Sequence, residues 1–318
     1  MTGHAPPDDD TRHPTGESRG LRRLFYGERN ERLRATWRVV VAVVTFAAVF
    51  VPVGLVVGLL PLPGLLRNAP GILPAVAGTA VVSLVAKRLE GRTIAEQGFS
   101  LDRSWWYDFV GGVGIGTVAM ALAMLLWMEV GAVRVVETLS TGVVSAPLAA
   151  VAVVTAAVGY LGVALWEEVV FRGVLVRNGI DGLVARGLSR RTAVVGAVGL
   201  GVVTFGVLHS LVPARGATAT FAVLQAVLGA VYFTAAYVLT ESLALPIGIH
   251  FAMNFTNAGL FPTNSSVPAL VRVNQTLTVE PSVVGVPVVL TLLLTLAVVA
   301  WVRLTRGAVS ISDCFDVR

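Results

Sequence analysis

Eight long apolar runs constrain this chain more than any other feature of its sequence. Each spans roughly 17–25 residues, which is the length that a helix needs to cross the apolar core of a bilayer. The expected spans are Trp37–Leu60, Gly71–Ala86, Phe109–Val130, Val151–Val176, Thr192–Leu211, Ala219–Leu239, Leu243–Leu260 and Val283–Val302.

Composition supports this interpretation. Apolar residues make up 55% of the 318 residues and charged residues only 14%. A soluble fold of this size cannot cover so much apolar surface, and a disordered chain would be more polar. The sequence therefore predicts an all-α, polytopic membrane protein with about eight transmembrane helices.

The basic residues predict the orientation of these spans. If the N-terminal tail is cytoplasmic, 20 of the 24 Lys and Arg residues fall on the cytoplasmic side. Only Arg67, Arg134, Arg215 and Arg272 fall on the opposite side. Since cytoplasmic loops carry the excess of Lys and Arg, we expect a multi-pass protein of the cell membrane with both termini cytoplasmic. The net charge of +5 is spread over the span ends, so no nucleic-acid partner is expected.

A few ionisable residues interrupt the apolar runs. Burying such groups in lipid is costly, so they usually belong to a functional site. Glu167 and Glu168 are the carboxylates that break a run, and Arg172 follows them. Glu168 and Arg172 are four residues apart, so they share a helix face and can pair. Glu167 points about 100° away and can face a cavity and accept a proton from water. A purely structural Glu–Arg clasp is the alternative.

Two further spans each carry polar residues. His209 lies one helical turn after Phe205, and Asn254 lies one turn after His250. Two donors on one helix face can stabilise an oxyanion, but each group also suits hydrogen bonding between helices. Taken together with the glutamates, these residues indicate a polar cluster that converges from three helices.

The three motifs resemble those of a known family. Glu167-Glu168-x-x-x-Arg172, Phe205-x-x-x-His209 and His250-x-x-x-Asn254 are similar to the motifs of the CAAX prenyl protease and bacteriocin-processing family. These intramembrane endopeptidases are related to the type II CAAX protease. The resemblance runs from about Ala146 to Gly259 and implies an eight-helix membrane core.

The resemblance also implies roles for the residues. Glu167 would be the general base that activates water, assisted by His209. His250 and Asn254 would hold the oxyanion, and Glu168 with Arg172 would orient the site. The implied reaction is hydrolysis of a peptide bond in a membrane-associated protein or peptide, with the lipid bilayer as the other partner.

Four segments follow from this assignment. Residues 1–36 form a polar cytoplasmic tail that is largely disordered, and residues 37–145 form the N-terminal transmembrane helices. Residues 146–260 form the catalytic core, and residues 261–318 form the final transmembrane helix and a short cytoplasmic tail. Trp105, Trp106 and Tyr107 are expected to anchor the chain at the membrane interface.

Other functions remain open. No cofactor is expected, but Glu167, His209 and His250 would also make a catalytic zinc set. A proton-coupled transporter would place similar residues in the membrane, although the chain has no evident pair of related halves. A non-catalytic scaffold that binds membrane proteins is the third alternative.

The depth of His209 poses a problem. It lies about 27 Å along a straight helix from Arg191, roughly 11 Å deeper than Glu167 would be if its span ended near Asn178. We therefore expect the first two turns of the His209 helix to stand in the membrane interface, with Thr192 as the cap. A carboxylate oxygen of Glu167 should then lie within about 6 Å of an imidazole nitrogen of His209.

Overall fold

The computed structural model describes residues 23–27, 32–61, 71–142, 145–211, 217–263 and 267–309. Most of the predicted disordered tail lies outside these residues. The described elements are α2 (Ala35–Gly58), α3 (Ile72–Glu90), η3 (Ala95–Gln97), α4 (Arg103–Glu129), β1 (Val133–Ser140), α5 (Ala146–Glu168), η4 (Val169–Val176), α6 (Arg177–Val184), α7 (Arg190–His209), α8 (Ala219–Thr240), α9 (Ala244–Asn254), η5 (Phe255–Leu260), β2 (Ala269–Gln275) and α10 (Pro281–Arg306).

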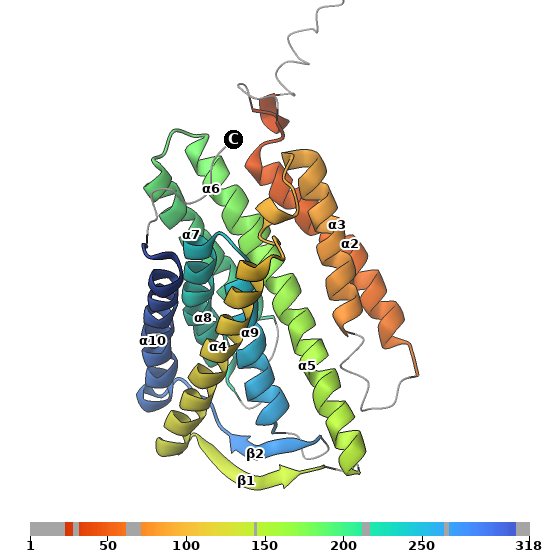
Figure 1. The fold of residues 1–318 in the computed structure, drawn as a ribbon, viewed down its shortest axis with the longest axis vertical. Coiled ribbons are helices and arrows are strands. Elements are labelled where there is room, and N and C mark those ends of the chain that lie inside the picture. The colour runs from red at the N-terminus through yellow and green to blue at the C-terminus, as the bar shows by residue number, and fades with distance from the viewer. Residues whose placement is uncertain are drawn as a thin grey trace, which may run out of the picture.

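The helices form the membrane-spanning bundle that the sequence predicted. Within the described residues, seven helices are long and apolar enough to cross a membrane. The continuous pair α9–η5 corresponds to the remaining predicted span, and it is too short to count among the seven. The start of α2, the end of α3 and the end of α10 lie toward one end of the bundle, and β1 and β2 lie at the other (Figure 1).

The helix that begins at Ala146 is longer than expected. It continues through α5, η4 and α6 to Val184, a run of 39 residues. The expectation that it ends near Asn178 is therefore wrong. Its middle part, η4, is a π-helix that begins directly after Glu168. A π-turn adds a residue to a turn and re-aims the side chains on either side of it, and such turns are frequent at functional sites.

Close contact between α4 and α9 fixes the helix that carries His250. An added Cβ atom at Gly112 would lie 2.5 Å from the carbonyl oxygen of Leu245, and one at Gly248 would lie 2.3 Å from that of Phe109. Since no side chain fits there, glycine lets the two backbones touch, as small residues do between membrane helices. α9 is consequently buried along almost its whole length.

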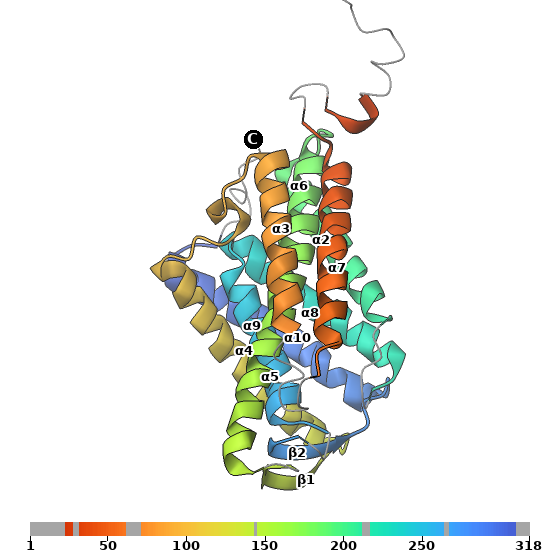
Figure 2. The ribbon, with the colours of Figure 1, turned by 90° about the vertical axis from the view of Figure 1, so that its right-hand side faces the viewer.

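A two-stranded antiparallel sheet closes the end of the bundle opposite to the start of α2 (Figure 2). β1 joins α4 to α5, and β2 precedes α10. The ladder pairs Val133 with Gln275 and Ser140 with Ala269, with an irregularity after Val135. This sheet was not predicted from the sequence, because its strands lie in the connections between the long apolar runs.

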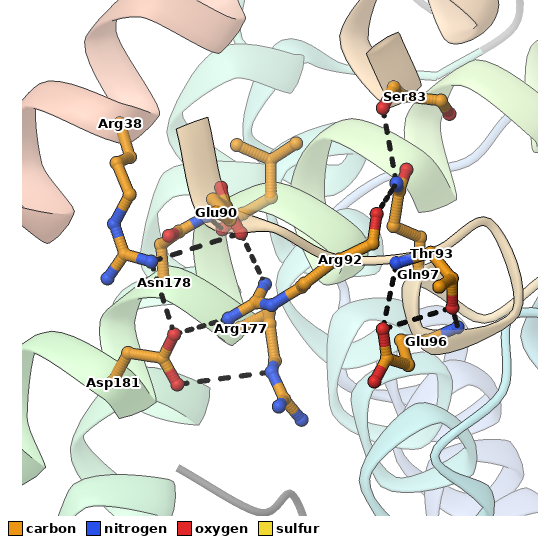
Figure 3. A network of polar contacts seen from close by, with 11 residues as sticks. Arg38, Ser83, Glu90, Arg92, Thr93, Glu96, Gln97, Arg177, Asn178 and Asp181 are labelled. Carbon is orange, nitrogen blue, oxygen red and sulfur yellow. Dashed lines mark hydrogen bonds and ion pairs between the residues drawn. The ribbon is translucent and has the colours of Figure 1, made fainter. Parts of the chain in front are cut away.

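A cluster of buried polar residues joins three helices at the other end of the bundle (Figure 3). Arg38 comes from α2, Glu90 from the end of α3, and Arg177, Asn178 and Asp181 from α6, while Arg92 follows α3. We call these six residues the end cluster. In the Arg92 guanidinium, Nη1 lies 2.6 Å from Glu90 Oε2, and Nη2 bonds Asp181 Oδ2.

The remaining contacts of the end cluster link α2 and α3 to α6. Arg38 Nη1 lies 3.5 Å from Asp181 Oδ2, and Asn178 Nδ2 donates to Glu90 Oε1 at 3.1 Å. The same amide nitrogen also donates to the carbonyl oxygen of Val174 in η4. The cluster therefore fastens the N-terminal helices to the helix that carries Glu167.

Two details of the helix starts differ from expectation. Trp105 is buried, and its indole nitrogen donates to the Gly98 carbonyl at 2.8 Å, so it is a packing residue rather than an interfacial anchor. Trp106 and Tyr107 are exposed, as expected for anchors. The N-cap of α7 is Ser189, whose hydroxyl accepts from the backbone nitrogen of Thr192, so Thr192 is not the cap.

Candidate active site

The three motifs meet inside the bundle. Glu167 and Glu168 end α5, Arg172 lies in η4, His209 ends α7, and His250 lies in the middle of α9. The packing of α9 on α5 and of α7 on η4 brings these elements together. The convergence that the sequence indicated is therefore found, and each helix contributes the residues expected of it.

Glu168 is the most deeply buried of these residues and accepts hydrogen bonds from two side chains. Its Oε1 atom accepts from Arg172 Nη1 at 3.0 Å and from His250 Nδ1 at 2.7 Å. The side chains of Glu168 and Arg172 are 0% and 1% exposed. The pairing with Arg172 was predicted from the spacing, whereas the bond to His250 was not. A charge without partners at this depth would be very unfavourable, so the three groups depend on one another.

Glu167 is arranged differently from its neighbour. Its Oε2 atom lies 3.9 Å from His209 Nε2 and 3.7 Å from His250 Nε2. Within the described residues this oxygen has no hydrogen-bond partner, although it is buried. The distance to His209 falls inside the 6 Å limit set by the sequence analysis. Both gaps exceed a direct hydrogen bond and match an arrangement in which a water bridges the groups.

The Nδ1 atoms of both imidazoles are hydrogen-bonded, which orients the rings. His209 Nδ1 lies 2.8 Å from the carbonyl oxygen of Phe205, and because a carbonyl only accepts, Nδ1 carries the proton. His250 Nδ1 likewise donates to the carboxylate of Glu168. Both Nε2 atoms consequently face Glu167. The His209 side chain is 33% exposed, whereas that of His250 is 6% exposed, so the site is open on the His209 side.

Aromatic rings hold the charged groups in place. Phe205 lies under the Arg172 guanidinium at 4.6 Å and against the His209 ring at 4.2 Å. Phe233 of α8 stacks on the His250 ring at 4.6 Å and also faces Arg172. A cation over an aromatic face is stabilised by the ring quadrupole. Sequence reasoning missed Phe233, because nothing distinguishes this residue from the other apolar residues of its run.

Asn254 is the last residue of α9, one turn beyond His250. It is partly buried and has no hydrogen-bond partner in the described part of the chain. The next residue begins η5, a second π-helix. In two of the three motif-bearing helices, α5 and α9, the change from α to π therefore follows directly after the last motif residue of the α-helix.

Comparison with known proteins yields one match. Residues 147–256 match the family model described as type II CAAX prenyl endopeptidase, Rce1-like. No match was found among curated proteins or among solved structures. The matched segment covers about a third of the chain and includes Phe205 and all six polar motif residues.

The match agrees with the fold and with the motifs. It begins at the start of α5 and ends two residues after Asn254, so it spans the three helices that supply the polar cluster. The matching family is described as one of endopeptidases. The resemblance predicted from the motifs is thus confirmed, and residues 147–256 of this polytopic membrane protein are similar to the Rce1-like type II CAAX prenyl endopeptidases.

Proposed function

We propose that this protein is an intramembrane endopeptidase that hydrolyses a peptide bond of a membrane-associated protein or peptide. The observation that carries the proposal is the position of Glu167 Oε2, buried, without a hydrogen bond and less than 4 Å from two imidazole nitrogens. We also propose that the protein resides in the cell membrane with both ends cytoplasmic, on the strength of its basic residues.

In the first step a water molecule lies between Glu167 and His209. It donates one hydrogen to Glu167 and the other to the bare Nε2 of His209, so its lone pairs face the substrate carbonyl carbon. As the water oxygen bonds to that carbon, Glu167 takes its proton. The carbonyl π electrons move to oxygen and form a tetrahedral oxyanion.

The oxyanion then needs donors. His250, which is held by Glu168 and stacked on Phe233, donates from Nε2 when it is protonated, and Asn254 donates from its amide nitrogen. Glu167 next gives its proton to the amide nitrogen of the scissile bond. The C–N bond breaks and leaves a carboxylic acid and an amine, which balances the hydrolysis.

A zinc-dependent version would use the same side chains. Two imidazoles and a carboxylate suit zinc chemically. Among the described residues, no three His, Cys, Asp or Glu side chains are arranged so as to hold a metal ion. The steps above use only side chains of this chain, and metal analysis distinguishes the two versions.

Reconstitution in proteoliposomes tests the proposal. The substrates are quenched fluorescent peptides, one carrying a prenyl group and one a plain transmembrane segment. Wild-type protein should cleave at least one of them, and Glu167→Ala should not. Glu129→Ala, which removes an exposed glutamate at the end of α4, is the matched control and should cleave normally.

The outcomes separate the classes of function. Wild-type protein that cleaves no peptide of either kind contradicts the protease assignment and favours a transporter or a scaffold. Activity that a chelator removes and zinc restores, with about one zinc per chain by elemental analysis, favours the zinc version.

A further inference from the structure

A hollow at the end of the bundle where α2 begins has the chemistry of an anion site. It has a volume of about 510 Å³ and is lined by Arg23, Leu24, Arg34, Thr36, Trp37 and Arg186. We call it the arginine cup. Three of its six residues are arginines and none is acidic. Arg186 of the cup follows the end of α6, whereas Glu167 lies near the end of α5, with η4 and α6 between them. The cup plays no part in the proposed hydrolysis.

Backbone carbonyls hold two of the arginines in position. Arg34 Nε donates to the carbonyl oxygens of Arg23 and Tyr26 at 2.9 and 3.3 Å. Arg186 Nη1 donates to the carbonyl of Gly182 at 2.9 Å. In the part of the chain that the structure describes, neither guanidinium has a carboxylate partner. Each keeps further N–H groups for a ligand, because guanidinium has five donors.

The two acids of the end cluster, Glu90 and Asp181, are already engaged by arginines. The end cluster, which lies next to the cup along α2 and α6, sets three arginines against two carboxylates (Figure 3). Glu90 and Asp181 are therefore not available to neutralise Arg34 and Arg186. The contact of Arg38 with Asp181 also ties α2, which carries Thr36 and Trp37, to α6, after which Arg186 follows.

The position of the cup favours a lipid over a soluble anion. Two of its lining residues, Thr36 and Trp37, lie in the first turn of α2, a 24-residue helix that is apolar enough to span a membrane. The N-terminus of such a helix offers free N–H groups and a positive dipole end. Trp37, whose indole nitrogen donates to the Leu24 carbonyl, is of the residue type that lies at headgroup level.

We infer that the arginine cup binds the phosphate headgroup of an anionic glycerophospholipid of the surrounding bilayer. Basic pockets beside transmembrane helices bind such headgroups, and the volume suits a small polar ligand. The acyl chains would extend along α2, whose outer face is exposed and apolar at Val40, Val43 and Val44. A zwitterionic headgroup carries an added positive charge that the arginines repel.

Native mass spectrometry of the full chain tests the inference. The protein is released from micelles doped with phosphatidylglycerol or with phosphatidylcholine, and the bound lipid is counted. Wild-type protein should retain phosphatidylglycerol preferentially. The pair Arg34→Gln and Arg186→Gln should lower its affinity by roughly tenfold or more, since each basic residue near a membrane surface contributes about 1 kcal/mol.

Matched variants guard against misfolding and nonspecific charge effects. The pair Arg88→Gln and Arg303→Gln removes two exposed arginines at the same end of the bundle and should leave retention unchanged. The pair Arg34→Lys and Arg186→Lys keeps the charge and should restore most of the binding. Equal retention of both lipids, or normal retention by the Gln pair, would overturn the inference. Inorganic phosphate that displaces the lipid at low millimolar concentration would identify a soluble-anion site instead.

Discussion

The two buried ionic clusters of this protein use similar side chains but partner their carboxylates differently. In the end cluster, Glu90 and Asp181 each contact arginine within ordinary ion-pair distance. At the candidate active site, Glu168 is partnered in the same way by Arg172 and His250. Glu167 alone among these four acids has only imidazole nitrogens nearby, at distances that leave space for a water.

This difference indicates what each carboxylate does. A buried acid that arginine fully engages is stable but chemically inert, because its lone pairs are occupied by permanent donors. A buried acid whose neighbours stand one water away keeps the capacity to take a proton. Burial and charge alone therefore do not identify the reactive residue. What distinguishes Glu167 is the kind of neighbour: within the described residues its close ionic contacts are the two imidazole nitrogens at 3.7 and 3.9 Å, whereas each of the other three acids contacts an arginine.

The largest effect is expected from Glu167→Gln. The amide keeps the shape of the side chain but cannot accept a proton from water, so kcat should fall by about 10²–10⁴-fold. The melting temperature in detergent should hold or rise slightly, since a poorly solvated charge is removed. Peptide cleavage and thermal unfolding of the same preparation check both parts. Near wild-type turnover would mean that the base lies elsewhere.

Glu168→Gln should mainly damage stability. The change leaves Arg172 without its carboxylate partner and weakens the hold on His250, and breaking a buried pair costs about 3–5 kcal/mol. A large drop in melting temperature, together with loss of activity, is the expected result. If the variant were as stable as wild type but inactive, Glu168 rather than Glu167 would become the candidate base.

Asp181→Asn tests the end cluster by the same means. Its side chain is 10% exposed, so the cost should be somewhat smaller, about 2–3 kcal/mol. We expect a lower melting temperature with kcat within about threefold of wild type for the protein that remains folded, because Asp181 touches no reacting group. A loss of activity as large as that of Glu167→Gln, without destabilisation, would break the comparison between the clusters.

The smallest effect is expected at the sheet, where Arg272 and Glu137 form a third Arg–carboxylate pair. The bonds from Arg272 and from Ser140 lower the pKa of Glu137 below its ordinary value. A lowered pKa means that its stabilising effect is present above about pH 4.5 and is lost as the pH falls through the folded value. Since Glu137 is 51% exposed, Glu137→Gln should hardly change the melting temperature at pH 7. Melting curves between pH 3 and 7 should show only a small difference between the two proteins at pH 7, and that difference should disappear at the acidic end.

The sequence predicted the spans well, because long apolar runs have few alternatives to a membrane helix. Most observed helices begin and end within about four residues of the expected positions; α4 begins earlier, at Arg103, and the helix that begins at Ala146 extends to Val184. The six motif residues were also found from the sequence, since a charge inside an apolar run is conspicuous.

The end cluster could not be found in that way. Glu90 and Asp181 stand at the ends of apolar runs, where an acid ordinarily faces water or headgroups. Their contacts with Arg92 and Arg38 depend on how the helix ends are arranged, which one sequence does not reveal. Phe233 and the sheet were missed for a related reason, because their importance arises only from their neighbours in space.

The π-helix η4 lies between two parts of one continuous helix, and these parts supply side chains to two different sites. Before it, α5 must aim Glu167 and Glu168 into the site, and after it, α6 must aim Asn178 and Asp181 at the end cluster. Closing i to i+5 instead of i to i+4 takes one more residue into the turn, and the wider turn accommodates that residue while the α-helical turns on either side keep their directions. The loss of one codon between Val169 and Val176 would therefore disturb the two sites less than the loss of one codon within α5 or α6, where each residue turns the helix by about 100°.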